Sequence, residues 1–213
     1  MTRLGEHDSK MTNHSYAEAT YSNFNSHVSV EMIFEALERI GRIKRTGWVI
    51  SKIPFDLAED VAEHTLKVAF LTMHVSNLMA SKGVKLNVNK ALKMALIHDL
   101  SEAMVSDLPK TLKRKLGREK VGEIDLNILF DILSDFKGRD ELVGFFNEYL
   151  TDETVEAKVV SLADNLATYL QCMSYIEDYG IRTKHLMEIK VESLNEVLKL
   201  VKDLNLNREE LQI

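Results

Sequence analysis

The segment Asn89–Glu102, NKALKMALIHDLSE, decides the fold class of this chain. Its apolar residues recur every three or four positions, as on one face of an α-helix, and Asn87 or Asn89 can cap the start of that helix. The helix then ends in the adjacent pair His98 and Asp99. A histidine beside an acid at the end of an apolar helix indicates a polar site within a helical core.

The same spacing of apolar residues continues through most of the chain. Two prolines, Pro54 and Pro109, interrupt it, and no alternation typical of a β-strand is long enough to be useful. The sequence therefore predicts an all-α fold. Helices are expected at about residues 29–44, 60–81, 87–99, 124–133, 142–150, 152–180 and 186–201. Thr151 or Asp152 can cap the longest of them, and Gly180 can end it.

The composition predicts one globular domain. The chain has 213 residues, of which 45% are hydrophobic and 28% charged. We expect a polar N-terminal arm at 1–28, the domain at 29–205 and a C-terminal tail at 206–213. No apolar run approaches the roughly 20 residues that span a membrane. The formal net charge of -6 argues against a nucleic-acid polymer as partner. The single Cys172 fits a reducing compartment and predicts a cytoplasmic protein.

Four side chains from three predicted helices form a possible metal-ligand set: His64, His98, Asp99 and Asp164. His64 shares a helix face with the apolar residues Val68, Leu71, Val75 and Leu78. A lone inward histidine is usually a hydrogen-bonded core residue, and Asp164 has an alternative in a salt bridge to Lys93 or Arg42. Buried carboxylates are costly without a cation, however, and mixed nitrogen and oxygen ligands suit divalent transition metals.

Other polar residues are expected near this set. Glu102 follows His98 by four residues on the same helix face, and Asp107 precedes Pro109, which turns the chain. A surface glutamate and a turn-forming aspartate are the ordinary alternatives for these two acids. Arg45 can offer paired N–H donors to a phosphate, although a basic residue also suits a helix C-terminus. The basic stretch at 110–118 is expected to be a solvated face, with added attraction for phosphate as the alternative.

With these residues, the chain resembles the HD-domain phosphohydrolases. The family's H…HD…D pattern is matched by His64, the His98-Asp99 pair and Asp164. Further matches are similar to the 5'-deoxynucleotidase branch of the family, and the resemblance runs from about residue 29 to residue 180. These matches are RTGWV at 45–49, EHT at 63–65, HDLSE at 98–102, DLP at 107–109, EY at 148–149 and EAK at 156–158.

The resemblance implies an HD-domain helical bundle that hydrolyses 2'-deoxynucleoside 5'-monophosphates to deoxynucleoside and phosphate. It implies one divalent cation (Mn, Co, Fe, Ni, Zn or Mg) bound by the four residues of the ligand set. Glu102 and Arg45 would be catalytic, and Arg45, Trp48 and Asp107 would bind the substrate. Thr46 and Gly47 separate Arg45 from Trp48, whereas the equivalent pair is adjacent in bacterial members.

Two other functions remain open at this stage. The same site could act on a different phosphoester, or the chain could be a catalytically silent module that binds metal and nucleotide. In each case the expected ligand is a small-molecule nucleotide. Spare apolar stripes on the helices also leave room for a homodimer.

Overall fold

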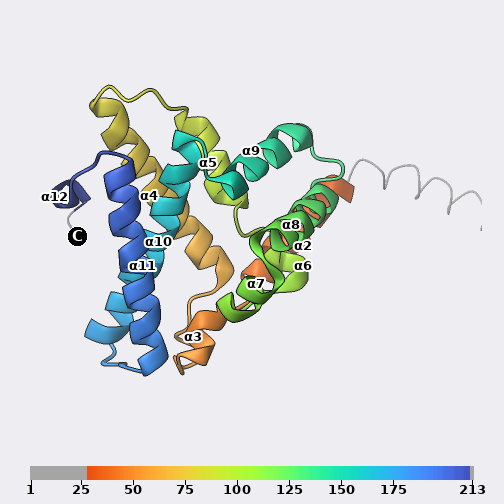
Figure 1. Ribbon diagram of the computed structural model, residues 1–213. Helices are drawn as coiled ribbons and strands as arrows, with labels where there is room; N and C mark the ends of the chain where they lie inside the picture. Colours follow the sequence, from red (N-terminus) through yellow and green to blue (C-terminus); the bar gives the residue numbers. More distant parts are fainter. Residues whose placement is uncertain (1–27, 212–213) are drawn as a thin grey trace, which may run out of the picture.

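Helices are the only extended secondary-structure elements among the described residues. The computed structural model describes residues 28–211, and within that range no strand forms beyond an isolated bridge between Lys44 and Asp60 (Figure 1). The predicted all-α fold is confirmed. The N-terminal arm predicted at 1–28 lies outside the described residues, apart from Val28. The helices are α2 (Val28–Ile40), α3 (Thr46–Ile50), α4 (Val61–Ser81), α5 (Val88–Ile97), α6 (Glu102–Val105), α7 (Lys110–Leu116), α8 (Arg118–Ile132), α9 (Arg139–Thr151), α10 (Val155–Glu177), α11 (Lys184–Asp203) and α12 (Arg208–Leu211).

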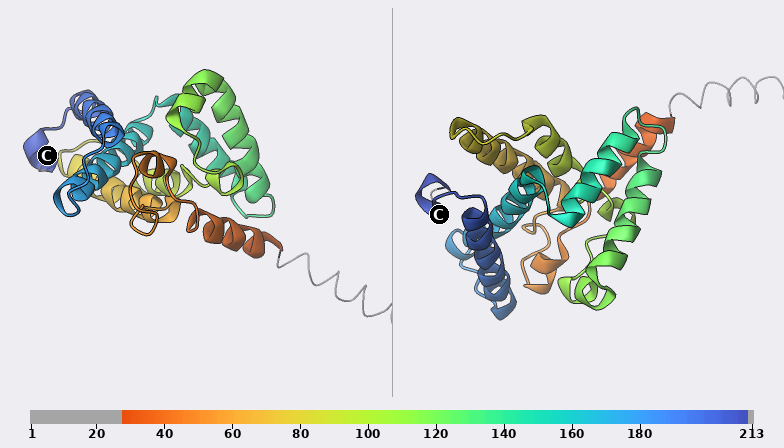
Figure 2. Two further views of the ribbon diagram at one scale, coloured as in Figure 1. Left: turned by 90° about the horizontal axis from the view of Figure 1, so that it is seen from below. Right: turned by 45° about the horizontal axis from the view of Figure 1, so that its top comes forward.

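Helix α10 is the centre of the bundle and packs against α4, α5, α9 and α11. Its Leu162 and Leu166 join Val75 of α4 and Val197 of α11 in one buried apolar cluster. Helices α4, α10 and α11 lie on one side of the molecule, and α8 and α9 lie on the other (Figures 1 and 2). The helices that carry the first and last predicted ligands, α4 with His64 and α10 with Asp164, therefore belong to the same packed core.

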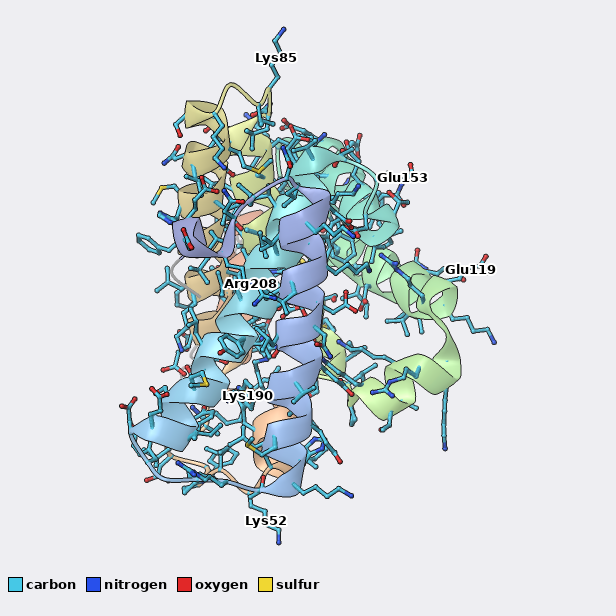
Figure 3. The ribbon with its side chains drawn as sticks, turned by 60° about the vertical axis from the view of Figure 1, so that its left-hand side comes forward. Lys52, Lys85, Glu119, Glu153, Lys190 and Arg208 are labelled. Atoms are coloured by element: carbon cyan, nitrogen blue, oxygen red, sulfur yellow. The ribbon has the colours of Figure 1, made fainter. Side chains whose placement is uncertain are left out.

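The second side of the molecule has its own apolar cluster. Phe146 of α9 and Leu129 of α8 are buried there with Ile97 of α5 and Ile40 of α2. Charged side chains such as Lys85 and Glu119 point away from the body of the protein (Figure 3). No helix in the described range is long and apolar enough to cross a membrane.

The helix starts follow local capping rules. Asp60 and Glu63 form a reciprocal capping box at α4, and Asn87 accepts a hydrogen bond from Lys90 N–H at α5. The cap predicted for α10 is wrong. Asp152 has a left-handed backbone and ends α9, so the chain turns once more and Thr154 caps α10 instead. Gly180, with φ +69°, follows the end of α10.

Four short helices, α3, α6, α7 and α12, were not predicted. The basic stretch at 110–118 forms α7 and the start of α8, and Gly117 turns the chain between them with φ +86°. At the other end of the chain, Leu206 is buried and Lys82 Nζ lies 2.5 Å from Glu210 Oε2. In its described part, the segment predicted as a tail thus packs onto the bundle.

Candidate active site

Three of the four predicted ligands lie within contact distance of one another. His64 is buried on α4, and His98 follows directly after α5 with its ring centroid 5.5 Å from that of His64. Asp99 Oδ2 lies 3.2 Å from His98 Nε2 and 3.8 Å from His64 Nε2. Two imidazole nitrogens therefore face a single carboxylate oxygen.

Asp164 of α10 completes the set. Its Oδ1 lies 2.9 Å from His64 Nε2, although the two residues are 100 positions apart in the chain. The alternative salt bridges for Asp164 do not form in the described structure, because Lys93 pairs with Glu141 and Arg42 pairs with Glu38. The structure therefore brings all four predicted residues to one place.

The donor atoms of this cluster fit a divalent cation. His98 Nδ1 lies 2.8 Å from the Ala95 carbonyl oxygen, so Nδ1–H donates there and Nε2 is the ring nitrogen that points to the cluster. That Nε2 is buried and has no hydrogen-bond partner among the described residues. An unpartnered imidazole nitrogen that faces two carboxylates is the arrangement a metal would satisfy.

The pKa values of His64, Asp99 and Asp164 favour the protonation states that bind metal. His98 differs, because the charges of Asp99 and Asp164 outweigh burial and raise its pKa, so a cation there would displace a proton. Burial, together with the charge of Arg45, lowers the pKa of His64. Burial alone would raise the pKa of Asp164, but the hydrogen bond from His64 lowers it to about 2. In the same way, His98 outweighs burial and holds the pKa of Asp99 well below its usual range. Ionised carboxylates beside a neutral imidazole are what a cation requires.

Arg45 lies just before α3 rather than at a helix C-terminus. Its Nη1 is buried and has no hydrogen-bond partner within residues 28–211. Burial alone would lower the pKa of Arg45, but nearby carboxylates, led by Asp99 and Asp164, raise it above its usual value. A permanently charged guanidinium with an unused donor thus faces the cluster, as an anion-binding residue would.

Glu102 is buried beside the cluster and pairs with a lysine that the sequence analysis assigned to a solvated face. Glu102 is 6% exposed, and Lys113 Nζ lies 3.2 Å from Glu102 Oε1. Burial raises the pKa of Glu102 well above its usual value, and the charges of Asp99 and Asp107 add to this effect. A carboxyl group with a raised pKa keeps its proton to higher pH than usual and is suited to act as an acid.

Asp107 and Trp48 both help to fix α3. Asp107 Oδ2 accepts a 2.6 Å hydrogen bond from Thr46 N–H, at the first residue of α3. Trp48 is 1% exposed, and its indole N–H donates to Glu59 Oε2 at 2.9 Å. Sequence reasoning missed Glu59, whose Oε2 also lies 3.9 Å from His64 Nδ1.

Most of these residues, though not His64 or Glu59, line one cavity of about 650 Å³. It extends from His98, Asp99 and Asp164 past Arg45 and α7 to α11. Cavities of this size hold small-molecule ligands. The cavity therefore offers an anion-binding end at the cluster and a partly apolar end lined by Ile50 and Ile189.

Comparison with known proteins identifies the family. A family model described as HD domain matches residues 37–202, which is most of the chain. The chain belongs to the HD-domain family. HD-domain proteins bind a divalent metal, in agreement with the cluster of His64, His98 and Asp99.

Curated relatives of this HD-domain chain are 5'-deoxynucleotidases. It is 29% identical to 5'-deoxynucleotidase HDDC2 of Danio rerio, over 80% of this chain and 83% of that protein. It is 30% identical to 5'-deoxynucleotidase HDDC2 of Dictyostelium discoideum, over 67% of this chain and 75% of that protein.

Solved structures share the fold. A conserved hypothetical protein from Pyrococcus furiosus has a TM-score of 0.69 and 34% identity, over 82% of this chain and 93% of that chain. An HD-domain phosphohydrolase from Listeria innocua has a TM-score of 0.68, over 82% of each chain. Its identity of 20% supports a common fold alone.

Proposed function

We propose that this HD-domain chain is a metal-dependent 5'-deoxynucleotidase. It releases phosphate from 2'-deoxynucleoside 5'-monophosphates, the activity for which its curated relatives are named. The observation that carries the proposal is the convergence of two buried histidines and two carboxylates at the end of a cavity that also holds Arg45 and Glu102. A silent metal-binding module has no need of the buried acid.

The proposed ligands are His64, His98, Asp99 and Asp164. A divalent cation held by them would lower the pKa of a water molecule and screen the charge of the phosphate. Manganese, cobalt, iron, nickel, zinc and magnesium are all candidates, because the donor types narrow the choice without deciding it.

The neighbouring side chains supply the remaining steps. Arg45 binds two phosphate oxygens through its guanidinium, which orients the ester for attack. Burial raises the pKa of Glu102, which favours its protonated form, and the carboxyl group gives its proton to the departing sugar oxygen. Lys113 is a positioning residue that keeps the Glu102 carboxyl in place through its 3.2 Å contact.

Trp48 and Asp107 form the sugar side of the proposed site. Both line the cavity. Asp107 already uses Oδ2 to hold α3, so its other carboxylate oxygen is the one that contacts the sugar. The Trp48 N–H is already bonded to Glu59, so Trp48 contacts the substrate through the apolar part of its ring, which this hydrogen bond holds in place.

A pair of matched variants tests this function. Wild-type protein is supplied with each candidate metal and each nucleoside and deoxynucleoside monophosphate, and released phosphate is measured. Asp99→Asn is expected to lower the rate at least about 100-fold, since loss of even an outer-shell partner typically costs 10- to 100-fold. Asp131→Asn makes the same chemical change at an exposed site on α8 and should leave the rate unchanged. Stoichiometric metal and tight nucleotide binding without phosphate release would instead favour a silent module.

A cytoplasmic homodimer is part of the proposal. Exposed apolar side chains on α2 (Val30, Phe34 and Leu37) and on α4 (Leu66 and Phe70) favour association with a second copy. The unpaired Cys172 favours a reducing compartment. Light scattering of wild type and of Phe34→Glu tests the dimer, and the variant should be monomeric.

A further inference from the structure

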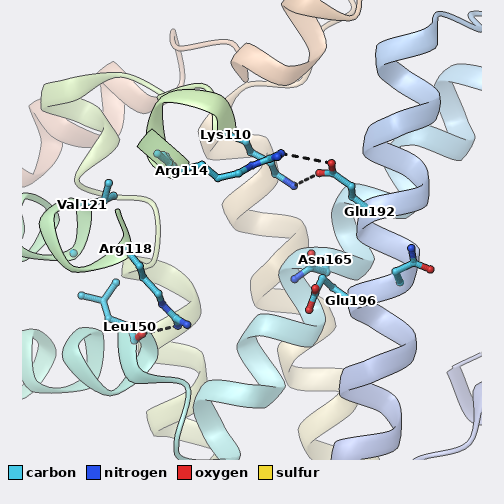
Figure 4. Close-up of a pocket in the computed structure, with 11 residues that line it drawn as sticks. Lys110, Arg114, Arg118, Val121, Leu150, Asn165, Glu192 and Glu196 are labelled. Atoms are coloured by element: carbon cyan, nitrogen blue, oxygen red, sulfur yellow. Dashed lines mark hydrogen bonds and ion pairs between the residues drawn. The ribbon is translucent and has the colours of Figure 1, made fainter. Parts of the chain in front are cut away.

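A second cavity of about 740 Å³ adjoins the candidate active site, between α7 and α11. The two cavities share lining residues, among them Lys110, Arg114 and Glu192. Glu192 of α11 reaches across to α7, where Oε2 lies 3.8 Å from Lys110 Nζ and Oε1 lies 3.5 Å from Arg114 Nη2 (Figure 4). One carboxylate thus stands at the boundary between the two cavities.

These ion pairs do little to stabilise the fold. The three side chains are 49–68% exposed, and exposed pairs contribute little to stability. Helix α7, Lys110–Leu116, buries none of its residues. The effect of Glu192 is therefore mainly electrostatic: it neutralises part of the positive charge on α7 and places negative charge beside the path into the second cavity.

Basic side chains outnumber acidic ones in the second cavity, whose lining includes one further carboxylate, that of Glu196. Lys113 and Arg118 line it together with the two cations that Glu192 contacts, and the amide side chain of Asn165 faces it (Figure 4). Arg118 uses one nitrogen to bind the Leu150 carbonyl oxygen at 2.6 Å, and its other donors are not occupied by that bond. The two cavities share Lys113, Arg114 and Glu192, so a phosphate chain that extends from the first cavity into the second would enter it beside Glu192.

We propose that Glu192 is a specificity-determining residue that restricts this site to nucleoside monophosphates. This role of Glu192 rests on the proposed 5'-deoxynucleotidase function. A monophosphate ends at the cluster and Arg45, whereas the second phosphate of a diphosphate has to pass Glu192. The carboxylate repels that phosphate and occupies the Lys110 and Arg114 charges that would otherwise attract it.

Binding to metal-loaded protein tests the proposal. The dissociation constants of dAMP and dADP are measured by calorimetry for protein with Glu192 and with Glu192→Gln, each also carrying Glu102→Gln so that dAMP is not hydrolysed during the titration. The protein with Glu192 should bind dAMP more tightly, and the variant should gain roughly three- to tenfold in affinity for dADP relative to dAMP, as expected for removing one partly screened charge. Glu192 is half-exposed, so the variant is expected to fold normally.

The control is Glu38→Gln. It removes the same charge and an exposed ion pair with Arg42, on α2 and outside both cavities, and should leave the ratio of the two affinities unchanged. Equal affinity of the protein with Glu192 for dAMP and dADP, or an equal change for both ligands in Glu192→Gln, would overturn the proposal. Absence of dAMP hydrolysis by wild type would count against the proposed function instead. The two failures can be told apart because the ratio of affinities is measured without turnover.

Discussion

Lys113 Nζ lies 3.2 Å from Glu102 Oε1, so a basic side chain from the exposed helix α7 reaches the buried acid of the site. Lys113 and the acidic residues of the site have opposite effects on the pKa of Glu102. Burial, Asp99 and Asp107 raise the pKa of Glu102, whereas the charge of Lys113 lowers it. The pH at which Glu102 loses its proton therefore depends on Lys113.

Replacing Lys113 by Met should move the pH profile of hydrolysis. Glu102 donates a proton, so kcat falls as pH rises through its pKa. Without the lysine charge this pKa rises further, and the alkaline limb should move to higher pH. Steady-state kcat measured across pH gives the midpoint. Lys113→Arg keeps the charge and should restore the wild-type midpoint, and a limb that moves to lower pH in Lys113→Met contradicts the assignment.

Glu102→Gln should remove the alkaline limb altogether. An amide cannot donate the proton to the leaving oxygen, so kcat should fall by about 10²- to 10⁴-fold, the usual contribution of general acid catalysis. Metal content, measured by elemental analysis, should stay at the wild-type level because Glu102 is not among the proposed ligands. Loss of metal along with activity would place Glu102 in the ligand set instead.

Asp164→Asn should weaken metal binding. One ionised oxygen is lost from the cluster, and affinity should fall at least about 100-fold, more than for an outer-shell change. Metal also stabilises the folded state that binds it, so the rise in Tm on adding metal should shrink in the variant. Thermal unfolding with and without chelator checks this. An unchanged metal-induced rise would remove Asp164 from the proposed site.

Trp48→Phe should destabilise the protein through Glu59. That glutamate is 2% exposed, and its Oε2 depends on the indole N–H. An unpaired buried acceptor costs about 1–3 kcal/mol, so the free energy of unfolding measured in urea should fall by that amount. In a Glu59→Gln background the same change should cost less. Equal costs in both backgrounds would show that ring packing, not the hydrogen bond, matters at Trp48.

Periodicity predicted the long helices because each of them buries an apolar stripe. The same pattern predicted that His64 faces the core, since it shares a face with the buried Val68 and Val75. Helix α7 was missed because it buries none of its residues, Lys110–Leu116. Lys113 then looked like one basic residue among several.

Contacts between distant segments were beyond local patterns. The inward direction of Glu59 depends on Trp48, on Lys67 of α4, and on Tyr175 of α10, whose hydroxyl accepts a hydrogen bond from Glu59 N–H at 2.9 Å. The spacing of these four residues does not predict that they meet. The edge-to-face contact of Trp48 with Tyr175, whose ring centroids lie 5.4 Å apart, joins their segments in the folded chain. The roles of the metal ligands were suggested by residue types and by family resemblance, and those roles remain predictions.

Asp107 offers a test that separates holding α3 from binding substrate. Asp107→Ala removes the acceptor for Thr46 N–H at the start of α3 and should cost about 1 kcal/mol, as the loss of an N-terminal cap typically does. Asp107→Asn keeps an acceptor oxygen, so its stability should stay near that of wild type. If the carboxylate also contacts the sugar, KM for a deoxynucleoside monophosphate should rise in Asp107→Asn although the fold is intact. Unfolding curves and steady-state kinetics on both variants give the answer, and an unchanged KM in Asp107→Asn would limit Asp107 to positioning α3 next to Arg45.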